Sequence, residues 1–180
     1  MLEGAGLPGL GPGLRAGVAS LAALAERCAE AEKVSGWTGE RAALARGAVL
    51  LWHDHLDAAH RIAQDVASRE GSWLHGMMHR REPDYSNAGY WYQRVGVHGA
   101  FVELARRAGR VVEELGDGEL KRMLFRGAAW NPLGFIDACE RCAADGSRHG
   151  WRGVLERIQG LEFEVFLEEL AGAREGGGAR

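Results

Sequence analysis

The sequence has few of the residues on which several classes of protein depend. Cysteine occurs only three times in 180 residues, and proline four times. An odd, small number of cysteines argues against the disulfide framework of a small secreted protein. No apolar run approaches the roughly 20 residues that a membrane-spanning helix needs. Residues 1–13 lack a basic segment followed by an apolar one, so we expect no signal peptide. These absences predict a soluble, cytoplasmic protein with no membrane partner.

The chain also lacks an excess of positive charge. Its 22 basic and 25 acidic residues give a formal net charge of −3, with a pI of about 6.2. A nucleic-acid-binding domain typically has a pI above about 9, so we expect no nucleic-acid partner. Lysine is nearly absent, because only Lys33 and Lys121 are lysines and all other basic residues are arginines. This bias is typical of a GC-rich genome, so a single arginine is weak evidence for anion binding.

Apolar residues recur at steps of three and four along most of the chain, and no convincing strand alternation interrupts them. This pattern predicts an all-α protein, a single compact helical bundle-like domain of about five to seven helices over residues 14–171. Residues 1–13 are predicted to be a flexible Gly/Pro-rich arm, and residues 172–180 a disordered tail. Helical segments, short turns included, are expected over residues 14–34, 40–68, 72–81, 88–94, 98–112, 119–125, 132–144 and 154–170. The segment 40–68 has the most regular apolar seam.

Residues that carry chemistry gather between positions 51 and 98, where six of the seven histidines lie. On a continuous helix over 40–68, one stripe at the edge of the apolar seam would contain His53, Asp57, His60 and Gln64. His75 and His79, four residues apart, would share a face of the next helix. The stripe is either a polar border whose members bond one another or part of a cleft. The charges that follow His79 either pair internally or face a ligand.

The sequence resembles a group of uncharacterised bacterial proteins of similar size over residues 50 to 140. The segments that carry the resemblance are LWHDHLDAAHRIAQ, HGMMHRREPDYSNAGYWYQRVGVH and WNPLGFIDACE. A weaker likeness is to small helical proteins of azinomycin-type pathways that close an aziridine ring by expelling sulfate. This likeness implies a role in specialised metabolism and a small anionic substrate.

The leading hypothesis is a small-molecule enzyme that uses metal-independent acid–base chemistry on an anionic substrate, for example aziridine ring closure with elimination of sulfate. Asp57, His60 and His53 would be catalytic, because imidazoles accept protons near neutral pH and a carboxylate orients them. The predicted substrate-binding residues combine guanidinium groups for the anion with neighbouring polar side chains: His75, His79, Arg80, Arg81, Asn87, Tyr90 and Arg94. We expect no cofactor and no metal in this scheme, because the nearby arginines would repel a cation.

Two alternatives remain open. The first is a metal-dependent enzyme whose ligands come from His53, Asp57, His60, His75 and His79, since histidines four residues apart are a permitted ligand spacing. The second is a non-enzymatic partner subunit of a biosynthetic complex, as a homodimer or with a heteromeric partner protein. Cys139 and Cys142 lack the second pair that a four-cysteine zinc site needs, so we predict that they are packing residues.

Overall fold

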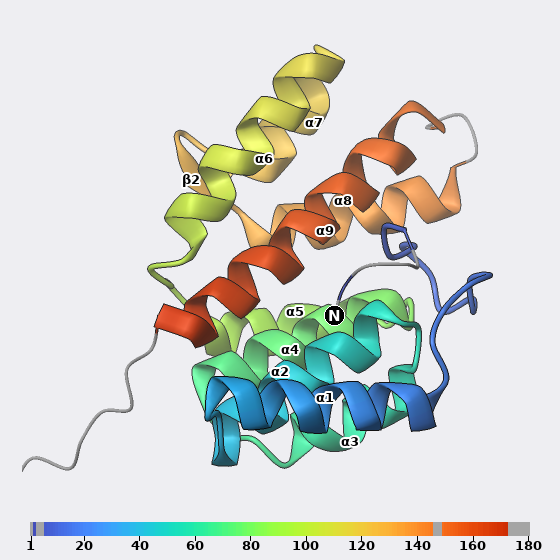
Figure 1. Ribbon diagram of the computed structural model, residues 1–180. Coiled ribbons are helices and arrows are strands. Elements are labelled where there is room, and N and C mark those ends of the chain that lie inside the picture. Colours follow the sequence, from blue (N-terminus) through green and yellow to red (C-terminus); the bar gives the residue numbers. More distant parts are fainter. Residues whose placement is uncertain (1, 3–5, 146–148, 173–180) are drawn as a thin grey trace, which may run out of the picture.

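The computed structural model describes residues 2, 6–145 and 149–172. Over these residues the chain forms nine helices and one small antiparallel hairpin (Figure 1). Their order is α1 (Leu21–Ser35), α2 (Gly39–Trp52), α3 (Leu56–Gln64), α4 (Arg69–Arg81), α5 (Tyr85–Val95), α6 (Phe101–Leu115), α7 (Gly118–Leu124), β1 (Phe125–Arg126), β2 (Ala129–Trp130), α8 (Pro132–Ala144) and α9 (His149–Gly172). The all-α prediction is confirmed, although the described helices outnumber the five to seven expected.

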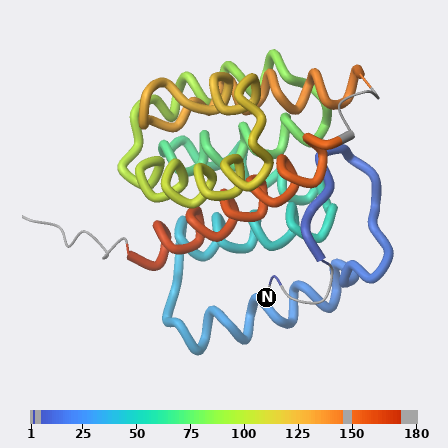
Figure 2. The backbone as a smooth tube through the Cα atoms, turned by 90° about the horizontal axis from the view of Figure 1, so that it is seen from above, coloured from blue at the N-terminus to red at the C-terminus, as the bar shows by residue number. Residues whose placement is uncertain are grey.

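Helices α1 to α5 form one half of the molecule, and α6 to α8 with the hairpin form the other (Figure 1). The long helix α9 runs diagonally across both halves and packs on α2, α6 and α8. Figure 2 shows α1 lying along the outside, where it buries only Leu24 and Cys28. The most extensive helix pair is α4 with α5, and α3 also packs on α4. The candidate site is built from these three helices.

Local sequence explains where several helices begin and end. The side chains of Ser20, Ser68 and Asp117 accept hydrogen bonds from the first free N–H groups of α1, α4 and α7, which would otherwise lack partners. Gly36 and Gly116 end α1 and α6 with φ near +70°, a conformation that costs glycine little. Helix α8 begins with Pro132 in its first turn, as the sequence predicts.

The core is continuous between the two halves because large aromatic side chains of α9 lie against both. Trp73 of α4 contacts Phe166 of α9 and Phe101 of α6, with ring centroids 5.2 and 4.9 Å apart. Trp52 at the end of α2 contacts Phe163 of α9 at 5.4 Å. These near-perpendicular ring pairs add stabilisation beyond the apolar area that they bury.

The predicted continuous helix over residues 40–68 is wrong, because the chain breaks into α2 and α3 at residues 53–55. Asp54 lies in the left-handed region with φ of 64°, which non-glycine residues rarely adopt. The break contains neither glycine nor proline. It is held instead by distant residues, because the Asp54 carboxylate bonds Arg15 and Arg81. The single stripe of His53, Asp57 and His60 therefore does not exist.

Residues 6–13 contain no helix, as predicted, but they are bound to the domain. The helix expected from residue 14 begins only at Leu21, so that boundary is wrong. Backbone carbonyls of residues 6–11 accept hydrogen bonds from Arg15, Arg81 and Gln159, and Leu10 is buried. The tail predicted over 172–180 lies outside the described residues, except for Gly172 at the end of α9. A search of the described helices finds none long and apolar enough to cross a membrane.

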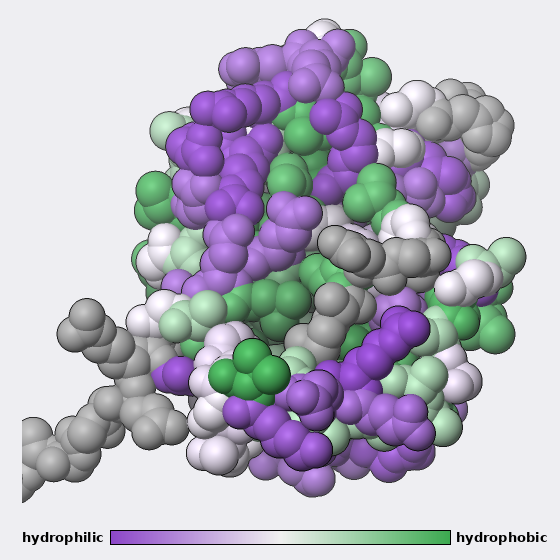
Figure 3. Space-filling model, viewed as in Figure 1, coloured by the Kyte–Doolittle hydropathy of each residue, from purple (hydrophilic) through white to green (hydrophobic). Residues whose placement is uncertain are grey.

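The exposed faces of α6 and α9 carry arginines and glutamates that pair across the two helices. Arg107 bonds Glu103 on its own helix and Glu168 on α9, and Arg157 on α9 bonds Glu114. Figure 3 shows the resulting hydrophilic band over α6. Exposed ion pairs of this kind contribute only about 0–1 kcal/mol each.

Candidate metal centre

Three histidines from two helices converge at one point of the fold. His60 comes from the middle of α3, and His75 and His79 lie one turn apart on α4. One ring nitrogen of each lies within 4.8 Å of the others. The His60 ring stands edge-on to the other two, with centroids 4.8 Å from His75 and 5.1 Å from His79. The shared face of His75 and His79 is confirmed, whereas His60 joins them because α3 packs on α4.

Helix α5 covers this group with an aromatic ring. Trp91 stacks on His75 with centroids 3.9 Å apart, and His75 stacks on His79 at 4.8 Å. Helix α5 comes this close to α4 because Gly76 has no side chain, since a Cβ there would lie 2.7 Å from the Tyr92 ring. The result is that His75 and His79 are about 95% buried, at 4% and 5% exposure.

The hydrogen bonds of the three imidazoles are incomplete. Nδ1 of His75 is buried and has no hydrogen-bond partner among the described residues, although an unpaired buried polar atom typically costs about 1–3 kcal/mol. Nδ1 of His79 lies 3.2 Å from a carboxylate oxygen of Glu82. Nε2 of His79 lies 3.1 Å from the side-chain amide of Asn87. Both ring nitrogens of His79 therefore have polar neighbours, and a carboxylate beside one ring nitrogen is common around metal-bound histidines.

The surroundings of His75 and His79 disfavour their charged forms. Burial, together with the neighbouring His79 and His60, lowers the pKa of His75 to about 4. Burial also lowers the pKa of His79, although the carboxylate of Glu82 partly opposes this shift. Neutral imidazole is the form that binds a metal ion, so these lowered pKa values of His75 and His79 favour the binding form.

The structure places Arg80 away from the histidines, in a buried ion pair. Its guanidinium bonds Glu162 of α9 at 2.5 Å and the Tyr92 hydroxyl at 3.0 Å, and it lies 4.3 Å from the Phe135 ring centroid. Burial alone would lower the pKa of Arg80, but the Glu162 carboxylate raises it above its ordinary value. Trp73 also donates to Glu162. Arg80 is 1% exposed and its pairing is internal, so no surface is left on it for a substrate.

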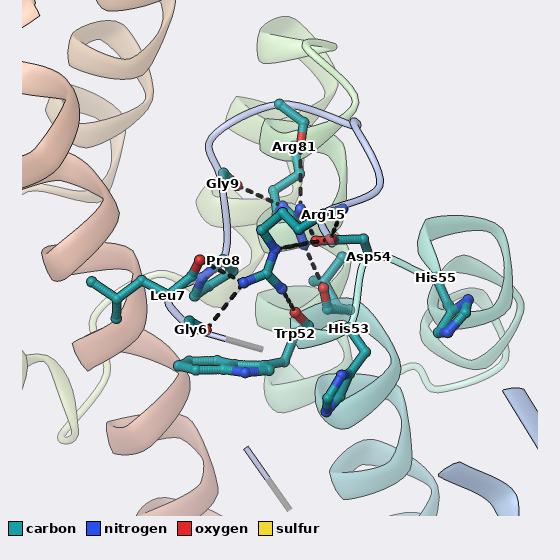
Figure 4. Close-up of polar contacts among 12 residues, drawn as sticks. Gly6, Leu7, Pro8, Gly9, Arg15, Trp52, His53, Asp54, His55 and Arg81 are labelled. Atoms are coloured by element: carbon teal, nitrogen blue, oxygen red, sulfur yellow. Dashed lines mark hydrogen bonds and ion pairs between the residues drawn. The ribbon is translucent and has the colours of Figure 1, made fainter. Parts of the chain in front are cut away.

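Arg81 is buried in a second internal network (Figure 4). It bonds the Asp54 carboxylate at 2.6 Å and donates to the carbonyls of Leu51, Gly9 and Gly11. Burial alone would raise the pKa of Asp54, but bonds from Arg15 and Arg81 outweigh it and lower that pKa. Figure 4 shows Arg15 and Arg81 both reaching the carboxylate, with His53 and His55 pointing away.

The remaining predicted residues occupy different places. His53 is buried at the end of α2, where its Nδ1 accepts from the backbone N–H of Ala19, so it does not join the other histidines. Asp57 is exposed in the first turn of α3 and lines a hollow of about 400 Å³. Tyr90 and Arg94 lie on the outer side of α5, where the Arg94 guanidinium stands 5.9 Å from the Tyr90 ring centroid. Of the predicted residues, His60, His75, His79 and Asn87 are brought together.

Sequence reasoning gave no site role to Glu82 or Trp91. Glu82 follows His79 by three residues, which brings it to the same helix face. That spacing was a usable signal for Glu82. The stacking of Trp91 on His75 depends on how α5 packs against α4, which no local pattern reveals.

The three histidines form a group that could hold a metal ion. Zinc–nitrogen bonds of about 2.0–2.1 Å would place the ligand nitrogens roughly 3.3 Å apart, which small side-chain rotations reach from the observed spread. Repulsion by Arg80 and Arg81 is offset, because each is paired with a carboxylate, Glu162 and Asp54 respectively. Comparisons with protein-family models, with curated proteins and with solved structures found no match, so the geometry carries the functional argument alone.

Proposed function

We propose that this protein binds a divalent transition-metal ion through His60, His75 and His79 and uses it as a Lewis acid on a small molecule. The observation that supports this most directly is the convergence of three imidazoles, one of which has a buried ring nitrogen without a partner. A cation would supply the missing interaction. Imidazole donors suit zinc, copper, iron and nickel better than magnesium or calcium.

Three protein ligands suit catalysis, because they leave a coordination position for water or substrate. A bound metal lowers the pKa of such a water towards neutrality and polarises a carbonyl or phosphoryl oxygen. A hollow of about 400 Å³ is lined by Asp57 and Glu82, though by none of the three histidines, and would hold a small molecule. Glu82 connects the hollow with the histidine group, because it lines the hollow and bonds His79.

A second candidate is the metal-independent acid–base enzyme. It is favoured by the pairing of His79 with Glu82, because a base oriented by a carboxylate is a recurring catalytic arrangement. The hollow is also lined by Arg61, which has no ion-pair partner in the described part of the chain. Arg61 would then hold an anionic leaving group, such as sulfate, in place of the buried Arg80 and Arg81.

The deciding experiment is a titration of the chelator-treated protein with Co²⁺ and Zn²⁺, followed by calorimetry and by the visible absorption of Co²⁺. We expect one site per chain with micromolar or tighter affinity. His60→Ala and His79→Ala should each weaken binding by about 100-fold, or about 2.7 kcal/mol. His60 is half-buried, so its replacement should preserve the fold.

The matched control is His55→Ala, which removes another half-buried histidine whose ring bonds the carbonyl of Ala19. This variant should bind metal as the wild type does. If the wild type shows no saturable binding, or if His55→Ala weakens it as much as His60→Ala, the metal proposal is wrong. If chelator-treated protein turns over a substrate and His79→Ala abolishes this turnover, the protein is the metal-independent acid–base enzyme instead.

A further inference from the structure

A separate cavity of about 800 Å³ lies at the C-terminal end of α5 and shares no lining residue with the histidine centre. It is bounded by the end of α5, the first half of α6, the hairpin and the start of α8. Figure 1 shows β2 alongside α6 at this place. Cavities of 300–1,000 Å³ are typical of small-molecule sites.

The walls of this cavity are apolar. Phe101 and Ala105 of α6, Trp130 of β2 and Leu133 of α8 line it. At its rim, Val97 and Val102 are 95% and 76% exposed, although most large apolar side chains of the described residues are buried. A ligand with an apolar body would therefore shield the apolar side chains of both the walls and the rim from water.

The charge around the cavity has one sign. Its lining includes Arg106 and Arg126 but no aspartate or glutamate. Arg106 bonds Glu103, whereas Arg126 has no ion pair or hydrogen bond among the described residues. This differs from the α6–α9 surface, where Arg107 and Arg157 each meet a glutamate. The missing counter-charge at Arg126 favours an anionic group on the ligand.

We propose that this cavity binds a small apolar carboxylate, with its hydrocarbon body against Phe101, Val102 and Leu133 and its carboxylate at Arg126. The observed charge complementarity selects the anion over an amine, because no lining carboxylate would receive an ammonium group. The size of the cavity selects a small molecule over a folded partner. This site is independent of the metal proposal.

The test uses decanoate below its micelle concentration and follows tryptophan fluorescence, because Trp130 lines the cavity, with calorimetry as the second readout. Decylamine is the matched probe, since it has the same tail and the opposite charge. We expect saturable binding of decanoate at one site per chain. Decylamine should bind at least about tenfold more weakly, a difference of about 1.4 kcal/mol.

Two variants locate the site. Val102→Glu places a carboxylate at the exposed rim, and Arg126→Glu reverses the charge there, so each should weaken decanoate binding by about tenfold or more. Val34→Glu and Arg122→Glu are the controls, because both residues are exposed and neither lines the cavity. Exposed positions keep the fold intact, which circular dichroism verifies.

Three results would overturn the proposal. Absence of saturable decanoate binding would do so, as would equal binding of decanoate and decylamine, which reports apolar partition alone. A dimeric wild type that Val102→Glu converts to a monomer would show that a second copy of the chain covers the cavity. If the histidine variants lose metal binding but still bind decanoate, the decanoate site is independent of the metal site.

Discussion

The arginines and the histidines of α4 are neighbours in the sequence but differ in how the fold satisfies them. Arg80 and Arg81 turn towards carboxylates from α9 and from the α2–α3 connection, and both ion pairs are buried. His75 and His79 turn towards His60, and the carboxylate of Glu82 lies beside His79. A buried charge with its partner stabilises the fold, whereas a group of imidazole nitrogens is a donor set that suits a cation.

The largest expected effect tests the arginine network. Glu162→Ala should lower the free energy of unfolding by about 3–5 kcal/mol, because it leaves Arg80 charged and unpaired in the core and removes acceptors from Tyr92 and Trp73. Urea denaturation measures this loss. Glu164→Ala, an exposed glutamate on the same helix, should change little. Equal losses in the two variants would contradict the assignment of Arg80 to a structural role.

The next largest effect is the stabilisation of the folded chain by Zn²⁺ bound at the three histidines. At free Zn²⁺ about 100 times its dissociation constant, the wild type should gain about 2.7 kcal/mol, because only the folded chain brings the three rings together. Thermal unfolding with Zn²⁺ or with chelator measures the gain. His60→Ala should abolish it while unfolding at nearly the same temperature in chelator. A gain that persists in His60→Ala would place the metal elsewhere.

A smaller effect separates positioning from ligation. Glu82→Gln should weaken metal binding by about 10- to 100-fold, because Glu82 would orient the His79 ring without being a ligand. Co²⁺ titration measures the affinity, and the Co²⁺ absorption band should keep its shape because the ligands are unchanged. Asp57→Asn, at the same hollow, should leave the affinity unaltered.

Low pH should weaken the ion pairs of Arg15 and Arg81 with Asp54, because protonation removes the charge of this carboxylate. Its folded pKa is lowered below an ordinary value near 3.8. The stabilisation is therefore complete above the unfolded pKa and is lost as the pH falls below about 4. Asp54→Asn should be less stable than the wild type at pH 7, with a gap that narrows on acidification. Urea denaturation across this pH range checks the trend, and a constant gap would exclude it.

The smallest effect is expected on the surface. Arg107→Ala removes bonds to Glu103 and Glu168, but these pairs are exposed to water and ions. The loss should stay within about 1 kcal/mol and shrink further in 1 M salt. Denaturation at two salt concentrations measures it. A loss as large as that of Glu162→Ala would remove the contrast between buried and exposed ion pairs.

Several elements were accessible to sequence reasoning because their causes are local. Asn131 and Pro132 begin α8, and the spacing of His75 and His79 fixes their common face. The break between α2 and α3 was not accessible, because Asp54 is held by Arg15 and Arg81, 39 and 27 residues away. The sequence also could not show that Arg80 is unavailable to a substrate, because its ion-pair partner Glu162 lies 82 residues away.

By itself, the sequence determined that the chain would be helical and that two histidines would share a face of one helix, since helical periodicity is a property of neighbouring residues. Only the tertiary structure decided which charges are neutralised, that His60 completes the group and that Trp91 covers it. The reason is that burial and pairing depend on segments far apart in the chain, whose approach no local spacing encodes.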